Sequence, residues 1–523
     1  MRRYVAIGVV AALLAIAAPA ASARVLRVGT YKGIRGQYSS VQAAVNAARP
    51  GDWILIAPGD YKTSSSHAPK GANNAPAGIL ITTPRIHLRG MSRNKVIIDG
   101  TKPGSPVCSA RKAAQNLGPS LGKGPLGLNG IMVWKADDVW VQNVTVCNFL
   151  GGAGGDGDTG NEIWWNGGDG SGNIGGWGFY GSYLTATSTF FDNEKTAAEY
   201  GIFSSNWSGG TWDQTYASNF NDSGYYIGAC QQSCDQTIDH AHGEYSALGY
   251  SGSNSGGWML IENSRFDNNE DGFDTNSQNG DEPSPQNGAC PSGKTPPIAG
   301  GDSCWVLYHN LFDHNNNPNA PSAGSAAQGP VGTGLSLSGA RNDTVMDNTF
   351  EDNGAWGTIL VPYPDNGPPC TGGVVDWIGA GSCLFDESGD ALLGNTYVDD
   401  GYFGNPTNGD FALTNFEPGP TDCFSGNVES GGGAINSTPS NAEQMYPVCN
   451  GQDVQPTGFT QFTNEVLCDS QVSLSPGSPP PCTATDHYPR LSKVVMHKLP
   501  RNLASMPNPC AGVPANPWCR AKR

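Results

Sequence analysis

Four acidic residues fall within eight positions in the middle of the chain, and their side chains have the chemistry of a cation site. The run extends from Asp267 through Asp271 to Asp274. Carboxylate oxygens at close spacing are the ligands that Ca²⁺ prefers, so the run predicts calcium binding by these three aspartates. A structural role is the alternative, because Asn and Asp at chain corners often hydrogen-bond their own backbone. The similar runs at 352–354 and 399–401 favour that alternative.

A second group, which could act in acid–base catalysis, precedes this run. Asp239, His240, His242 and Glu244 fall within six positions. A histidine and a carboxylate within reach of each other can transfer protons to and from a substrate. Side chains alternate along a strand, so both histidines would share one face. If that face points outward, they lie one strand from Asp267, about 5 Å away. Surface or corner histidines without a chemical role are the alternative.

A third set consists of tryptophans that fall in predicted loops. Aromatic faces bind sugar rings well, because they combine apolar area with a polar tip. Many other aromatic residues have a place in the predicted core, whereas these have less structural reason to be there. The tryptophans expected to contact a glycan are Trp164, Trp165, Trp207 and Trp212.

These residues belong to a repeating sequence. A glycine followed by a large apolar residue occurs at Gly201, Gly224, Gly249 and Gly272, at intervals of 23, 25 and 23 residues. Each unit carries a short strand-like run and an Asn/Asp-rich corner, and none holds an amphipathic helical pattern. Such a period is typical of a repeat architecture, in which stacked turns bury a continuous column. The sequence therefore predicts an all-β, parallel β-helix solenoid whose glycines stack in one column.

Composition and charge agree with a solenoid and exclude some partners. A solenoid grows along one axis, so 523 residues do not require several domains. The 72 glycines and the low charged fraction of 14% suit turns and neutral strands. The net charge of −17 argues against nucleic acid or an anionic membrane as a partner.

The two ends of the chain depart from the repeat. Residues 1–23 combine two arginines, an apolar run and Ala21-Ser22-Ala23, which predicts a secretory signal. The apolar run is too short to span a membrane, so we expect a secreted or cell-surface protein without membrane insertion. Residues 24–430 are predicted to form the β-helix. Residues 431–523 are rich in Pro and Cys and predict an irregular cap, or a strap along the coil.

The 14 cysteines predict disulfide bonds, because their number is even and an exported protein meets an oxidising compartment. Sequence neighbours are the natural pairs, although connectivity does not follow from sequence. The predicted pairs are Cys230 with Cys234, Cys290 with Cys304, Cys370 with Cys383, and Cys510 with Cys519.

Two stretches resemble known β-helix proteins. Ser39 or Ser40 can cap a short helix that begins at Val41, and a strand follows at 53–56. This opening resembles that of pectin-lyase-like right-handed β-helix proteins, in which a helix caps the first turn. The turns within 175–320 resemble exported bacterial right-handed β-helix repeat proteins, through motifs such as Asp271-Gly272. The resemblance implies a right-handed coil with a short N-terminal capping helix, and it transfers no catalytic residue.

A resemblance to calcium-dependent pectate lyases bears on the reaction. Ile238-Asp239-His240 is similar to the Trp-Ile-Asp-His segment of many such enzymes, with Thr237 in place of the tryptophan. In those lyases the ion neutralises a uronate carboxylate while a lysine or arginine removes the proton at C5. The candidate bases here are therefore His242, Lys195 and Arg265.

The sequence thus favours a secreted, monomeric β-helix protein that recognises an extracellular polysaccharide, either by binding alone or with lyase-type cleavage. A non-catalytic cell-wall or surface protein, whose repeats serve as a spacer or adhesion face, is the alternative. A glycoside hydrolase is a third hypothesis, since such an enzyme needs only two carboxylates at a set separation.

Overall fold

The computed structural model describes residues 23–520, apart from 64–65, 70–74, 121, 123, 154–156, 280–283, 323–325, 366–369, 376–382, 450–452, 455–459 and 474–476. The predicted signal segment, residues 1–23, lies outside these residues except for its last position.

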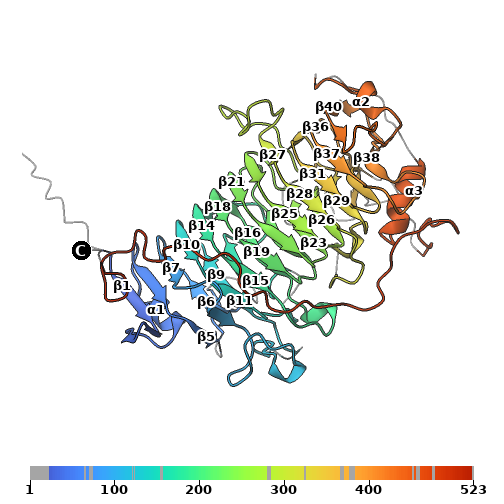
Figure 1. Ribbon diagram of the computed structural model, residues 1–523. Coiled ribbons are helices and arrows are strands. Elements are labelled where there is room, and N and C mark those ends of the chain that lie inside the picture. Colours follow the sequence, from blue (N-terminus) through green and yellow to red (C-terminus); the bar gives the residue numbers. More distant parts are fainter. Residues whose placement is uncertain are drawn as a thin grey trace, which may run out of the picture.

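Three long parallel sheets, here named I, II and III, run along the molecule (Figure 1). The chain visits them in that order, and each full coil adds one strand to each sheet. The two 11-stranded sheets therefore count eleven coils, with one further strand at the start of the 12-stranded sheet I. This topology is the all-β right-handed parallel β-helix predicted from the sequence.

Strand bounds follow the coil order. Sheet I holds β1 (Val25–Val28), β4 (Trp53–Ile56), β7 (His87–Gly90), β10 (Val139–Gln142), β14 (Phe179–Ser182), β18 (Gly210–Asp213), β21 (Gln236–Asp239), β24 (Met259–Glu262), β27 (Trp305–Tyr308), β30 (Asp343–Met346), β36 (Ala391–Leu393) and β40 (Cys423–Ser425). Sheet II holds β5 (Gly59–Lys62), β8 (Val96–Asp99), β11 (Thr145–Cys147), β15 (Thr185–Thr187), β19 (Tyr216–Ser218), β22 (His242–Glu244), β25 (Arg265–Asp267), β28 (Leu311–Asp313), β31 (Thr349–Glu351), β37 (Thr396–Val398) and β41 (Val428–Glu429). Sheet III holds β6 (Ala77–Ile81), β9 (Asn129–Trp134), β12 (Ile163–Asn166), β16 (Tyr200–Ser205), β20 (Ser223–Gly228), β23 (Leu248–Ser253), β26 (Asp271–Asn276), β29 (Thr333–Ser338), β32 (Trp356–Val361), β38 (Gly409–Leu413) and β42 (Ser437–Thr438).

Smaller elements decorate the coil. The short strands are β2 (Thr30–Tyr31), β3 (Ile34–Arg35), β13 (Gly176–Trp177), β17 (Trp207–Ser208), β33 (Tyr363–Asp365), β34 (Val374–Val375), β35 (Cys383–Phe385), β39 (Gly419–Pro420) and β43 (Asp453–Val454). The helices are α1 (Val41–Ala47), α2 (Ala442–Met445), α3 (Thr460–Asp469), and the 3₁₀ turns η1 (Lys112–Ala114), η2 (Glu194–Thr196) and η3 (Ala326–Gln328). None of the described helices is long and apolar enough to cross a membrane.

The predicted glycine column is confirmed. Gly201, Gly224, Gly249 and Gly272 occupy the second positions of β16, β20, β23 and β26, which pair in register. A Cβ atom on Gly249 would lie 2.3 Å from the carbonyl oxygen of Gly272. These glycines are required by close approach of neighbouring coils, whereas the left-handed corner conformations belong to other residues, such as Asn268 with φ 56°.

The interior is a stack of coils with apolar and aromatic columns. On the inner face of sheet II, Phe266, Phe312, Phe350 and Tyr397 stack with ring centroids 5.6, 5.0 and 5.0 Å apart. All four side chains are fully buried. Helix α1 covers the first coil with Val41, Ala44 and Val45, and Ser40 Oγ caps it by accepting from the Ala43 amide at 3.3 Å. The predicted capping helix is therefore present.

Seven disulfides pin the described chain, and they include the four predicted pairs. The other three join Cys108 with Cys147, Cys423 with Cys449, and Cys468 with Cys482. Most join cysteines fewer than 30 residues apart, so they fix loops and corners rather than linking distant coils.

The C-terminal segment 490–519, here called the strap, runs back along the coil to the first strands (Figure 1). Its backbone bonds side chains of several coils: the His497 amide donates to Asn219 at 2.9 Å, and the Leu503 amide to Asn94 at 3.1 Å. At the far end, the Trp518 indole donates to the carbonyl of Ile34 at 2.9 Å. The strap therefore ties the last part of the chain to the first coil.

Candidate functional site

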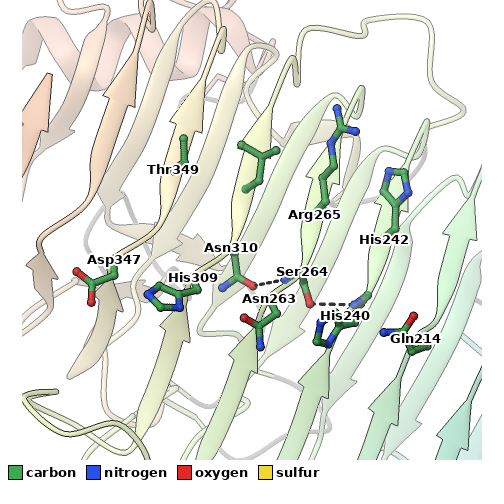
Figure 2. Close-up of a pocket in the computed structure, with 12 residues that line it drawn as sticks. Gln214, His240, His242, Asn263, Ser264, Arg265, His309, Asn310, Asp347 and Thr349 are labelled. Carbon is green, nitrogen blue, oxygen red and sulfur yellow. Dashed lines mark hydrogen bonds between the residues drawn. The ribbon is translucent and has the colours of Figure 1, made fainter. Parts of the chain in front are cut away.

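An open groove of about 740 Å³ follows the corner between sheets I and II (Figure 2). Two rows of side chains form most of it. The first row consists of corner residues with positive φ, one from each of five coils: Gln214, His240, Asn263, His309 and Asp347. The second consists of the first residues of four adjacent strands of sheet II: His242, Arg265, Leu311 and Thr349.

The rows arise because equivalent positions of successive coils stack at strand spacing, about 4.8 Å. His242 pairs with Arg265 across β22 and β25, and Arg265 pairs with Leu311 across β25 and β28. Chemical groups are therefore repeated along the coil axis at a spacing close to the length of one sugar unit in an extended polysaccharide. A groove of this form suits a chain-like ligand lying parallel to the coil axis.

His242 and Asp267 form the central pair of the site. His242 Nε2 lies 2.5 Å from Asp267 Oδ1. The other oxygen, Oδ2, accepts from Asn268 Nδ2 at 2.6 Å and lies 3.2 Å from Arg265 Nη2. The Asp267 side chain is only 3% exposed, whereas that of His242 is 31% exposed. Asp267 therefore orients the imidazole, and His242 presents it to the groove.

Glu244 lies beside this pair, with Oε2 3.8 Å from His242 Nε2. The Tyr216 hydroxyl donates to the same carboxylate. Burial raises the pKa of Glu244 above its usual range, against the lowering effects of the Tyr216 hydrogen bond and His242. Burial and Glu244 likewise raise the pKa of Tyr216. The cluster thus holds one exposed histidine beside a carboxyl group that retains its proton to higher pH than usual.

Arg265, one of the predicted bases, is held by two carboxylates, and this arrangement disfavours loss of its proton. Its guanidinium donates twice to Asp313, from Nε at 2.8 Å and from Nη2 at 2.7 Å. The hydrogen bonds to Asp313 and the charge of Asp267 raise the pKa of Arg265 above its already high value. The side chain is 46% exposed, so it can still contact an anion in the groove. Lys195 lies elsewhere, exposed in η2 between β15 and β16, and is not a lining residue of the groove.

The predicted calcium site at Asp267, Asp271 and Asp274 is not assembled. Asp267 lies on sheet II, whereas Asp271 and Asp274 lie on β26 of sheet III, beyond the corner at 268–270. Asp271 Oδ2 accepts from Ser336 at 2.6 Å, and Asp274 Oδ1 accepts from Ser338 at 2.7 Å. Asp271 and Asp274 thus each have their own hydrogen-bond partner. The corner separates these two carboxylates, on sheet III, from Asp267 on sheet II.

The four predicted sugar-binding tryptophans are buried. Trp165, Trp207 and Trp212 have no exposed surface, and Trp164 is 5% exposed. Trp164 and Trp165 belong to β12, which pairs with β9 and β16, and the Trp164 ring stacks on Phe203 with centroids 4.8 Å apart. The glycine-rich sequence around Trp164 and Trp165 predicts a loop, but this segment contains a regular strand of sheet III. These rings therefore stabilise the coil and cannot stack on a ligand.

Sequence reasoning missed His309, which lines the groove, and Tyr216 and Asp313, which bind Glu244 and Arg265 beside it. Residue counting would place His309, 46 residues after Asn263, two coils further on, whereas it lies one coil further because a long excursion precedes β27. His240 was expected on the strand face of His242, and it instead occupies the corner with φ 52°. Both histidines nevertheless line the same groove (Figure 2).

A metal ion in the groove is disfavoured by charge. Ligand atoms of His242, Glu244 and Asp267 lie within 4.8 Å of one another, a spacing that a cation could bridge. The Arg265 guanidinium, however, already contacts Asp267 at 3.2 Å. A fixed positive charge at that position repels a second cation, so the cluster is better described as an acid–base network.

No protein-family model matches the chain, and no curated protein matches it. Solved structures do. The chain is similar to the A-module of the mannuronan C-5 epimerase AlgE4 of Azotobacter vinelandii (12% identity, 76% of this chain and 86% of that chain, TM-score 0.45). It is also similar to an alginate lyase of Paenibacillus sp. (12% identity, 72% and 95%, TM-score 0.38) and to the pectate lyase Pel9A (15% identity, 79% and 79%, TM-score 0.34).

Proposed function

We propose that this protein is secreted, binds an anionic extracellular polysaccharide along the groove, and cleaves it by a lyase-type reaction with His242 as the base. The observation that carries the proposal is the partly exposed His242 imidazole, held by the buried Asp267 carboxylate at 2.5 Å in an open groove. A histidine held in this way has one nitrogen fixed by its partner and one nitrogen available to accept a proton.

The charge of the groove supports an anionic ligand. The protein as a whole carries −17, but three of its eight histidines and one arginine line the groove: His240, His242, His309 and Arg265. Asp347 is the one acidic lining residue. With the histidines neutral, the lining charges of Arg265 and Asp347 cancel, so the groove is less negative than the protein as a whole and repels an anionic chain less.

The reaction that these groups suit is β-elimination at a uronate. With Nε2 bonded to Asp267, His242 Nδ1 takes the proton from C5 of the sugar. The C4–O bond then breaks, its electron pair leaves on the departing oxygen, and a C4–C5 double bond forms. Glu244, whose pKa burial raises and which lies beside His242, would return a proton to the leaving oxygen. Arg265 would contact the uronate carboxylate and so favour loss of the C5 proton.

The test uses the mature chain, residues 24–523, with polygalacturonate, alginate and a neutral glucan. We expect ultraviolet absorbance from unsaturated product with a uronate polymer and none with the glucan. His242→Ala should lower the rate by at least about 100-fold, since general base catalysis contributes about 10²–10⁴. His309→Ala is the matched control, because it lines the same groove without a carboxylate partner at hydrogen-bond distance among the described residues; it should weaken binding and retain turnover.

Three results would contradict the proposal. New reducing ends without unsaturated product would indicate hydrolysis, and binding without any product would indicate an adhesion protein. Equal activity of His242→Ala and the wild type would remove the histidine from the reaction. Lys195→Ala, outside the groove, should behave as the wild type throughout.

A further inference from the structure

Aspartates form a ladder at the corner that leads into sheet I near the C-terminal end of the coil. The Asp343 amide donates to Asp390 Oδ1 at 2.7 Å, and the Asp390 amide donates to Asp422 Oδ1 at 2.9 Å. Asp343 itself accepts from Gln286 Nε2 on both oxygens, at 2.7 and 2.9 Å. One carboxylate per coil thus stacks along the axis, inside the protein.

The same coils contain a second ladder, in which uncharged asparagine side chains accept hydrogen bonds from backbone amides in the same way. At the corner between sheets I and II, the Asn348 amide donates to Asn395 Oδ1 and the Asn395 amide to Asn427 Oδ1, each at 3.0 Å. Each asparagine also donates its own Nδ2 to a carbonyl, as Asn395 does to Val345 at 2.9 Å. An aspartate lacks this donor. The ladder geometry alone therefore does not explain the charged residues at Asp390 and Asp422.

Several oxygens of this cluster are buried and have no hydrogen-bond partner among the described residues. They are both oxygens of Glu387, Oδ2 of Asp390 and Oδ1 of Asp386. Glu387 is 1% exposed, Asp390 0% and Asp386 6%. The Glu387 and Asp422 carboxyl groups are also close enough for each to act on the pKa of the other. An unpartnered, fully buried carboxylate aimed at other carboxylates calls for a positive charge.

Among the described residues, protein cations meet this need only in part. Arg341 is the basic residue whose charge acts on Asp386 and Asp390. Its hydrogen bonds go to main-chain carbonyls, from Nε to Asp386 at 3.3 Å and from Nη2 to Gly372 at 2.9 Å. One guanidinium thus faces the four carboxylates of Asp386, Glu387, Asp390 and Asp422.

We propose that Asp386, Glu387, Asp390 and Asp422 bind one Ca²⁺ ion that holds the last coils together. The donors are all oxygens, which excludes the softer metals that choose nitrogen and sulfur. Calcium takes 6–8 oxygen ligands in flexible geometry, whereas Mg²⁺ requires octahedral geometry and is usually bound by one or two carboxylates with several waters. The ion would join the corner before β36 to the corner before β40. This site is separate from the groove, so it stands or falls independently of the polysaccharide proposal.

The experiment uses the mature chain, stripped with a chelator at pH 7.5 and titrated with Ca²⁺ or with Mg²⁺. We expect one Ca²⁺ per chain by calorimetry, a rise in melting temperature on adding Ca²⁺, and a smaller rise with Mg²⁺, because a ligand that binds only the native state stabilises it. The test variant is Glu387→Gln with Asp390→Asn. It keeps the Asp390 acceptor position, so it should fold, lose the Ca²⁺ response, and melt no lower than the stripped wild type.

Asp271→Asn is the matched control: it changes a buried acid whose oxygens already have donors, and it should leave the Ca²⁺ response unchanged. A Ca²⁺ response that persists in the double variant would overturn the assignment. Absence of Ca²⁺ binding in the wild type, together with stripped protein that gains stability below pH 6, would show that protons rather than a cation neutralise the cluster.

Discussion

His242 Nε2 and Asp267 Oδ1 lie 2.5 Å apart, although 25 residues separate them in the sequence. The contact exists because β22 and β25 are neighbours in sheet II, with His242 opposite Arg265 and Glu244 opposite Asp267. The imidazole therefore reaches diagonally to the next coil rather than to the residue directly opposite. The stacking of coils thus builds the site, and no single turn contains it.

Asp267→Asn should lower kcat at least about 10-fold with little change in KM. This loss is part of the rate enhancement of about 10²–10⁴ that a general base contributes. An asparagine that presents its amide to Nε2 reverses the hydrogen bond and favours the wrong histidine tautomer. Since Asp267 is buried, it does not touch the polysaccharide, and binding should persist. The measurement is the steady-state rate across substrate concentration and pH.

Asp313→Asn controls for the loss of a negative charge near Arg265. Asp313 holds the guanidinium but makes no hydrogen bond to His242 among the described residues. This variant should change KM, through the position of Arg265, more than kcat. If both variants lowered kcat equally, the effect would belong to the charge of the network and not to the orientation of His242.

Much of the fold could be predicted because each coil of a solenoid repeats the same sequence pattern at a nearly constant spacing. The spacing of Gly224 and Gly249 predicted a column of close approach, and α1 followed from a serine cap and an apolar face. The tryptophans were placed wrongly because glycine-rich sequence indicates turns locally, whereas Trp164 and Trp165 extend a sheet built by distant coils. Strand pairing outweighed local composition there.

The site was predictable only over one coil. His242 and Asp267 follow from a single period, but Asp313, which fixes Arg265, lies 48 residues further along, beyond a long excursion. Counting residues cannot predict such a partner. Asp271 and Asp274 were grouped with Asp267 because they are near in sequence, yet three corner residues suffice to move them to another sheet.

Gly249→Ala should lower the free energy of unfolding by about 1–3 kcal/mol, the usual cost of overpacking. The new Cβ would lie 2.3 Å from the Gly272 carbonyl oxygen, so two coils must separate. Gly433→Ala is the control, since its Cβ would meet only the flexible side chain of Glu429, at 3.0 Å. Denaturant unfolding of both variants measures the difference, and equal stability would remove the close-approach argument.

Trp518→Ala should release the end of the strap from the first coil. The Trp518 side chain is buried, and its indole donates to Ile34 and stands 5.6 Å from the Tyr31 ring. Loss of a buried tryptophan costs about 3–5 kcal/mol, here locally. Hydrogen exchange should therefore speed up in 505–519 while the amides of sheet III remain protected. Uniform exchange across the whole chain would contradict a separate strap.

Asp274→Asn should stabilise the protein above neutral pH. Burial raises the pKa of Asp274 from 3.8 to about 6. A carboxyl group whose pKa is higher in the folded state contributes stability below its unfolded pKa, and that contribution is lost as the pH rises through about 6. The wild type should thus lose stability from about pH 4 to about pH 6, by up to about 3 kcal/mol from this group.

The asparagine variant avoids this loss because it carries no charge at any pH, and the site can accept the new amide. Asn276 donates to Asp274 Oδ2 in the wild type, while the Oδ1 of Asn276 is buried without a hydrogen-bond partner. A flip of the Asn276 amide would let that oxygen accept from the new Nδ2, and Ser338 can still donate to Oδ1. Thermal melting of wild type and variant at pH 5 and pH 8, both with chelator, tests this. A variant less stable than the wild type at pH 8 would show that Asp274 is needed in its charged form.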